Sequence, residues 1–205
     1  MPRLFIIAGC NGSGKTTASY ALLPGMLECS EFVNSDEFAK SLSPFHPESA
    51  YVAASRYMLM KMRFLLQRKA DFCIETTLAT RSLLKVIKDA KDAGYYVTIL
   101  YFWLNSPDLA VARVAARVAT GGHNIKEETI RRRYNVGLHY LFRDFMPICD
   151  RWLLLDNSKV PFTVVAEASE DGKIIREPEK FSRIQAINAE YEKHLEEEKR
   201  KTKNV

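Results

Sequence analysis

Short apolar runs alternate along this chain with longer segments suited to helices. The runs have the length and composition of buried β-strands and span residues 4–8, 31–34, 71–74, 95–104 and 152–155. The segments expected to be helical span residues 16–23, 47–69, 81–93, 109–119 and 126–145, with a brief helix between the second strand and Pro44. This alternation predicts an α/β three-layer sandwich, in which a mostly parallel central sheet is covered by helices on both faces.

The longest apolar run, over residues 95–104, is β-branched and aromatic throughout, which is typical of a central strand buried on both faces. Two further runs, at 162–168 and 173–176, flank Asp171-Gly172 and predict a terminal hairpin, followed by a charged helix over 179–201. No Pro- or Gly-rich linker divides the chain, so we expect one domain over 1–205. Its lid is expected at about 113–135, and the C-terminal hairpin and helix at about 160–205.

The turn between the first strand and the first helix reads G-x-x-x-x-G-K-T. Its glycines permit backbone angles that turn successive N–H groups inward around a phosphate, and the following helix N-terminus adds positive potential. The Lys15 ammonium is expected to reach the β- and γ-phosphates, and the Thr16 hydroxyl to ligate Mg²⁺. The expected nucleotide-binding residues are Gly9, Asn11, Gly12, Ser13, Gly14, Lys15, Thr16 and Thr17. The loop is thus a P-loop, and the fold it predicts is that of the P-loop NTPases with ATP and Mg²⁺ as ligands.

The amino-acid composition narrows the class of ligand and the cellular compartment. The net charge is +5, and the excess of Lys and Arg lies between Asp108 and Arg151, which in a nucleotide-binding protein favours phosphate recognition over nucleic acid. The basic residues are not interleaved with aromatic ones as in a single-strand groove. The four cysteines are widely spaced, as in a reducing cytosol, and no apolar run reaches the ~20 residues that span a bilayer. We therefore expect a cytoplasmic protein without nucleic-acid or membrane partners.

Asp36 follows the second strand and is the first candidate for chemistry. A carboxylate that accepts the proton of the attacking hydroxyl is a standard part of phosphoryl transfer. Asp is also a favoured helix N-cap, and a short helix begins here, so a capping role is the alternative.

Glu75 and Thr77 close the third strand, where an acidic group can hold Mg²⁺ through water or orient the acceptor; the alternative is a solvated turn. Arg113 and Arg117, the lid pair, lie one turn apart on a helix that leads into Gly121-Gly122. A second basic group, Arg131, Arg132 and Arg133, follows this break, so the two helices and the Gly hinge are predicted to form a lid over the triphosphate. For some of these arginines a solvated basic face is the alternative.

Several motifs occur together over residues 2–158. They are PRLFIIAGCNGSGKTT, FVNSDEFA, DFCIETTLATR, RVAARV, GGHNIKEETIRRRY and RWLLLDNS. Their combination resembles the zeta-toxin family of P-loop kinases, especially its chromosomal branch, labelled predicted ABC-type ATPase or kinase. No role is assigned to His123 within this set.

The resemblance implies an ATP-dependent kinase in which Lys15 binds phosphate, Asp36 is the catalytic base, and the lid pair clamps the γ-phosphate. It implies that Glu75 and Thr77 position an acceptor sugar, UDP-N-acetylglucosamine in the toxins, and that a separate antitoxin protein is a partner. Where the toxins carry an Arg after the acceptor-side Thr, this chain has Ala79, so a homologue that changed its acceptor is an alternative. An ATPase switch that acts on a partner protein and a nucleic-acid or nucleotide kinase are the other functions left open.

Overall fold

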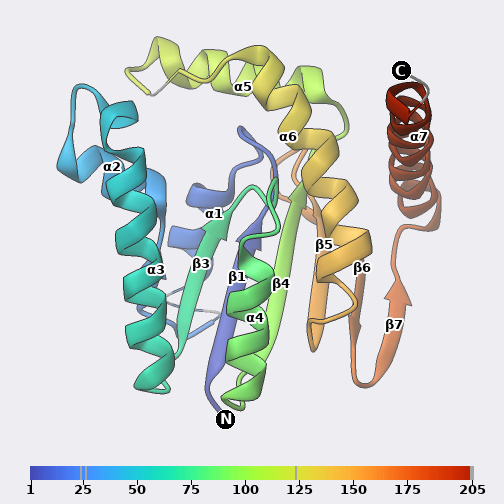
Figure 1. The fold of residues 1–205 in the computed structure, drawn as a ribbon. Coiled ribbons are helices and arrows are strands. Elements are labelled where there is room, and N and C mark those ends of the chain that lie inside the picture. Colours follow the sequence, from blue (N-terminus) through green and yellow to red (C-terminus); the bar gives the residue numbers. More distant parts are fainter. Residues whose placement is uncertain (24, 26, 123, 204–205) are drawn as a thin grey trace.

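The computed structural model describes residues 1–23, 25, 27–122 and 124–203, which form one seven-stranded sheet with helices around it (Figure 1). The strands are β1 (Arg3–Ala8), β2 (Glu31–Val33), β3 (Phe72–Thr76), β4 (Tyr96–Trp103), β5 (Arg151–Asp156), β6 (Thr163–Ser169) and β7 (Gly172–Ile175). The helices are α1 (Lys15–Leu22), α2 (Ser35–Leu42), α3 (Tyr51–Gln67), α4 (Leu83–Asp92), α5 (Pro107–Ala119), α6 (Glu127–Tyr140) and α7 (Pro178–Lys203).

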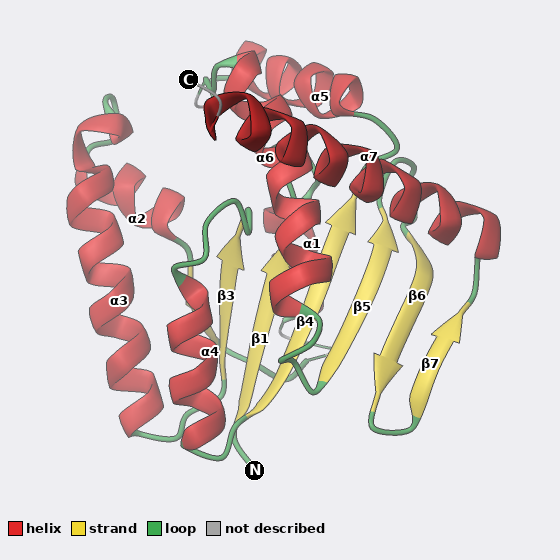
Figure 2. Cartoon of the chain, turned by 45° about the vertical axis from the view of Figure 1, so that its right-hand side comes forward, coloured by secondary structure: helices red, strands yellow, loops and turns green. Residues whose placement is uncertain are grey.

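The strand order is β2-β3-β1-β4-β5-β6-β7. The first five strands in this order pair in parallel, whereas β6 is antiparallel to β5 and β7 is antiparallel to β6. β4 lies in the middle of the sheet, and all but one of its residues are buried, as the apolar run predicted. The hairpin of β6 and β7 forms one edge (Figure 2), and Gly172 adopts a φ of 117° at its turn. The predicted α/β class and the mostly parallel sheet are therefore confirmed.

Alternate residues of β1 point to opposite faces, and each set enters a separate core. Leu4 and Ile6 belong to the larger core, to which α3, α4, α5 and α6 contribute, whereas Phe5 and Ile7 pack with α1 on the other face. Side chains from the two faces thus fix the end of β1, and the loop that follows it, relative to both helical layers.

The carboxyl ends of the parallel strands lie at one edge, below α5 (Figure 1). α5 begins two residues before the predicted range 109–119, because Pro107 occupies its first turn and the Ser106 hydroxyl accepts a hydrogen bond from Leu109 N at 3.1 Å.

Two predicted helices are broken up in the structure. The expected helix 47–69 starts as the 3₁₀ turn η1 (Pro47–Ala50) before α3, and the expected helix 126–145 ends as the π-helical turn η2 (Leu141–Phe145). No helix within the described ranges is both long and apolar enough to cross a membrane.

Candidate active site

The loop between β1 and α1 has the backbone of a phosphate cradle. Gly9, Gly12 and Gly14 adopt φ values of 145°, 78° and 85°, which side chains disfavour. A Cβ atom at Gly9 would lie 2.3 Å from the Phe102 carbonyl oxygen, and one at Gly14 would lie 2.4 Å from Asn157 Nδ2. Because Gly14 is the N-cap of α1 and has no side chain, the N–H groups of the first turn are left for another acceptor.

Lys15 and Ser13 show that this cradle fits an anion. The Lys15 side chain is buried, and its Nζ donates to the carbonyl oxygen of Cys10 at 2.8 Å, inside the loop. The Ser13 hydroxyl is buried and has no hydrogen-bond partner among the described residues. A buried ammonium and an unsatisfied hydroxyl beside inward-facing N–H groups are the polar groups that a phosphate would satisfy.

Cys10 lies in the same loop but is not a nucleophile. Burial raises the pKa of its thiol to about 11, although the positive charge of Lys15 acts in the opposite direction. The thiol is therefore neutral near pH 7, and the residue acts through its backbone.

Thr16, in the first turn of α1, meets Glu75, near the carboxyl end of β3. The Thr16 hydroxyl donates to Glu75 Oε1 at 3.0 Å, and Asn34 Nδ2 donates to Glu75 Oε2 at 2.9 Å. Burial raises the pKa of Glu75, while Lys15 and the Thr16 hydrogen bond lower it. A hydroxyl and one carboxylate beside a phosphate site fit Mg²⁺, which keeps several waters and takes its other ligands from substrate phosphates. Asn34 is the partner that the sequence analysis missed.

Asp36 lies in the first turn of α2 and does not cap it. The N-cap is Asn34, whose Oδ1 accepts hydrogen bonds from Asp36 N at 2.9 Å and Glu37 N at 3.3 Å. The alternative that Asp36 is the N-cap is therefore wrong, because the cap lies two residues earlier, at Asn34, and the helix already begins at Ser35. The Asp36 carboxylate is exposed.

Asp36 lines a cleft of about 360 Å³ between α2, α3 and the segment before α6. The other lining residues are Ser35, Tyr51, Ser55, Asn124, Ile125 and Arg133. Arg133 also reaches the phosphate loop, where its Nη1 donates to Asn11 Oδ1 at 3.0 Å. Burial raises the pKa of Tyr51 and the charge of Asp36 adds to the effect, whereas Arg133 and Arg117 lower it. The cleft thus combines a carboxylate with Arg133, which contacts the phosphate loop, and the charge of Arg117 acts on its Tyr51.

The remaining lid arginines have different environments. Arg113 donates from Nη1 to Asn157 O at 2.9 Å and from Nη2 to Ser158 O at 3.0 Å. Arg131 pairs on the surface with Asp108 at 2.6 Å and Glu127 at 2.8 Å, and Arg132 is exposed. Of the three consecutive arginines, Arg133 is the one that contacts the phosphate loop.

The Gly121-Gly122 break is a hydrogen-bonded helix end. Gly121 adopts a φ of 87°, and Gly122 N donates to Arg117 O at 2.9 Å. A Cβ atom at Gly122 would lie 2.5 Å from Arg117 Cγ, so this turn packs on the arginine side chain. Whether it also acts as a hinge stays a prediction. His123, the next residue, lies outside the described part of the chain.

The segment after β3 packs against α6. A Cβ atom at Gly137 would lie 2.6 Å from the Thr77 carbonyl oxygen, so the absence of a side chain permits this approach. Thr77 is half-buried, and Arg81, farther along, pairs with Asp144 at 2.9 Å. Thr17, on α1, is exposed.

Asn157 follows β5 and supports the phosphate loop from the other side. Its Nδ2 donates to the Ser13 carbonyl oxygen at 2.8 Å, and its backbone N donates to Trp103 O at 2.9 Å. Asn157 lies just after the apolar run 152–155, but the sequence gave no sign of this contact.

Residues 4–134 match the profile of a family described as "AAA domain". The chain belongs to the AAA domain family. An uncharacterized protein of Haemophilus influenzae is 32% identical over 126 residues, which are 62% of this chain and 88% of that protein.

Solved structures with the same fold extend the comparison beyond this AAA domain segment. The AvrRxo1-ORF1:AvrRxo1-ORF2 complex with sulphate ions matches with a TM-score of 0.72 and 16% identity over 90% of this chain. This chain spans 63% of the length of that protein. The PezAT chromosomal toxin-antitoxin system of Streptococcus pneumoniae matches with a TM-score of 0.63 and 16% identity, covering 93% of this chain and 87% of the other. The P-loop NTPase fold expected from the sequence is therefore confirmed.

Proposed function

We propose that this AAA domain protein is an ATP-dependent kinase that transfers the γ-phosphoryl group of ATP to a hydroxyl of a small-molecule acceptor. The observation that carries the proposal is the position of Arg133, which lines the cleft of Asp36 and contacts Asn11 of the phosphate loop. An acceptor in this cleft would have a carboxylate on one side and the phosphate loop on the other. A cleft of this kind serves transfer to a bound molecule better than a hydrolytic switch.

ATP supplies the phosphoryl group, and Mg²⁺ neutralises its charge. Gly12, Gly14 and Lys15 would hold the phosphates, with Thr16 and Glu75 as the protein side of the metal site. A related structure, AvrRxo1-ORF1:-ORF2 with ATP, has a TM-score of 0.66 to this chain. The cradle and the family membership support the same nucleotide here.

Asp36 would accept the proton of the attacking hydroxyl, and its exposure in the cleft leaves it free to approach the acceptor. Arg133 and Arg117 would stabilise the negative charge that develops on the transferred group. Arg113 stays a prediction as a γ-phosphate ligand, because it would have to leave two carbonyl oxygens to reach a phosphate. Glu75 and Thr77 are retained as acceptor-side residues.

For the acceptor we propose a UDP-sugar, UDP-N-acetylglucosamine first, and for the partner a separate antitoxin protein. Both rest on the motifs shared with the zeta toxins and, for the antitoxin, on the likeness to the PezAT toxin-antitoxin structure.

The test is to incubate the purified protein with ATP and Mg²⁺ and a panel of UDP-sugars, nucleosides and 5′-hydroxyl oligonucleotides. Mass spectrometry should detect phosphate on a small-molecule acceptor, and the Lys15→Ala variant should show none. Slow ADP release without a phosphorylated acceptor would contradict the kinase and favour an ATPase switch. Phosphate on the oligonucleotides alone would favour a nucleic-acid kinase.

A further inference from the structure

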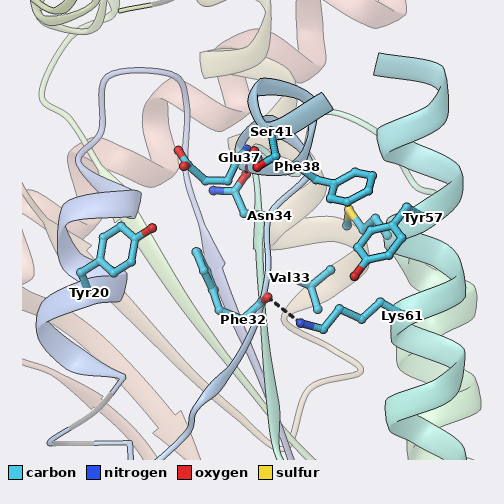
Figure 3. A pocket seen from close by; sticks show the side chains of 10 residues that line it. Tyr20, Phe32, Val33, Asn34, Glu37, Phe38, Ser41, Tyr57 and Lys61 are labelled. Atoms are coloured by element: carbon cyan, nitrogen blue, oxygen red, sulfur yellow. Dashed lines mark hydrogen bonds between the residues drawn. The ribbon is translucent and has the colours of Figure 1, made fainter. Parts of the chain in front are cut away.

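A second cavity, of about 210 Å³, lies beyond the edge strand β2, between α1, α2 and α3 (Figure 3). We call it the aromatic pocket and define it by Tyr20, Phe32, Asn34, Phe38, Tyr57 and Lys61. The function proposed above assigns it no ligand.

The rings of this pocket are arranged in two groups. Phe38 and Tyr57 are stacked, with ring centroids 3.8 Å apart and planes at 8°. Tyr20 meets Phe32 edge to face, with centroids 6.0 Å apart. Figure 3 shows Tyr20 on one side of the pocket and the stacked pair on the other. Tyr20 is 62% exposed and Tyr57 42%, so large aromatic surfaces face water across this cavity.

The aromatic pocket adjoins the phosphoryl site through two residues. Asn34 lines the pocket and also donates to Glu75, the partner of Thr16. Tyr20 lies four residues after Thr16 on α1, so both side chains are on the same face of that helix. A molecule in the pocket would therefore lie next to the metal end of the nucleotide site.

The pocket size restricts the ligand. Sites that enclose a whole small molecule measure roughly 300–1,000 Å³, so a cavity of about 210 Å³ takes only part of one. The aromatic rings favour a flat part, because aromatic side chains bind other π-systems by offset stacking or edge to face. At the rim, Lys61 Nζ donates to the Phe32 carbonyl oxygen at 3.3 Å and pairs with the Glu31 carboxylate at 3.0 Å.

We infer that the aromatic pocket binds a flat aromatic or heteroaromatic ring of the acceptor, an inference that rests on the kinase function proposed above. The ring stacks beside Tyr57 or Tyr20, and the rest of the acceptor passes over the first turn of α2. That turn presents Asn34 and Glu37 to the aromatic pocket and Ser35 and Asp36 to the cleft. The acceptor is accordingly a molecule with a ring at one end and the reacting hydroxyl at the other.

Two matched pairs of probes test the ring. Phenyl β-D-glucoside and methyl β-D-glucoside differ in the ring, as do uridine and ribose, and their binding to the full chain is measured by ligand-observed NMR titration. The ring-bearing member of each pair should bind at least about tenfold more tightly, since stacking on one aromatic side chain has this scale. Equal affinities within both pairs would overturn the inference.

Variants locate the binding. Tyr57→Ala and Tyr20→Ala should each weaken the ring-bearing probes about tenfold and leave the ring-free probes unchanged. Phe64→Ala is the matched control, because Phe64 is a 53% exposed aromatic residue of α3 outside the pocket, and it should change nothing. The inference fails if Phe64→Ala and Tyr57→Ala have the same effect.

The same titrations with Asp36→Asn separate this inference from the proposed function. Ring preference that persists in Asp36→Asn, together with a protein that phosphorylates no acceptor, supports the ring site and refutes the kinase. Phosphorylation of ring-bearing acceptors with the same KM in wild type and Tyr57→Ala supports the kinase and refutes the ring site.

Discussion

The Asn157 amide nitrogen donates to the Ser13 carbonyl oxygen at 2.8 Å, so a residue that follows β5 holds the phosphate loop that follows β1. Asn157→Ala removes this bond. We expect ATP affinity to fall about fivefold, because a hydrogen bond of about 1 kcal/mol would no longer preorganise the loop. Isothermal titration calorimetry measures the change, with the exposed Asn105→Ala as the matched control. Wild-type affinity in Asn157→Ala would show that the loop needs no support from this side.

Asp36→Asn tests the catalytic base without disturbing the fold. Because Asn34 caps α2, the substitution leaves the cap intact, and the melting temperature should stay within about 1 °C of wild type. Transfer to the acceptor should fall about 10²-fold or more, the scale of a positioned general base, with ATP binding retained. Phosphate transfer and calorimetry are measured together. Asp92→Asn, an exposed residue at the end of α4, serves as the control. Wild-type transfer in Asp36→Asn would move the search for the base to Glu75.

Arg133→Ala and Arg132→Ala form a matched pair on α6. Arg133 contacts Asn11 and lines the cleft, whereas Arg132 is exposed. Arg133→Ala should lower kcat about 10²-fold and affect ATP binding less, because its contact strengthens as charge develops in the transition state. Arg132→Ala should match wild type in steady-state assays. A change confined to KM in Arg133→Ala would make Arg133 a ground-state ligand only.

Lys180 and Asp156 join α7 to the end of β5 across 2.8 Å. Burial disfavours the Asp156 carboxylate, but hydrogen bonds from Lys180 and Ser158 outweigh this effect and lower its pKa. A depressed folded-state pKa stabilises the fold above the unfolded value of about 3.9 and ceases to do so as pH falls through the folded value.

Lys180→Met should therefore reduce the free energy of unfolding by about 1 kcal/mol at pH 7, a value limited by the partial exposure of Lys180. The deficit should shrink as the pH falls below about 4. Urea unfolding at pH 7 and at a pH below about 4 measures this deficit in the free energy of unfolding. The exposed Lys159→Met is the control. A deficit that is independent of pH would attribute the effect to packing.

The sequence alone predicted most of the fold, because the strands differ sharply from the rest of the chain in composition. The run 95–104 could be placed at the centre of the sheet, and the G-x-x-x-x-G-K-T spacing determined the geometry of the loop. The distinction between Arg133 and its two neighbours could not be predicted. It depends on the rotation of α6 about its axis, which packing sets and residue type does not.

Asn34 shows a second limit. Asn34, Ser35 and Asp36 are all good N-caps, so local preference could not decide which one begins α2. The hydrogen bond from Asn34 to Glu75 links residues 41 positions apart, and only the pairing of β2 with β3 brings them together. Local patterns therefore identified the edge of the sheet where the candidate site lies but not the contacts within it.

Gly137 lies one helical turn beyond Arg133 on α6, directly against the Thr77 carbonyl oxygen. Any side chain at position 137 would push α6 outward. The Arg133 guanidinium would then move away from Asn11, although neither Arg133 nor Asn11 had been changed. Position 137 therefore sets how closely α6 approaches the segment after β3. The geometry of the proposed transfer would then depend on a residue that has no functional group, and graded substitution there would vary the reach of Arg133 without changing its chemistry.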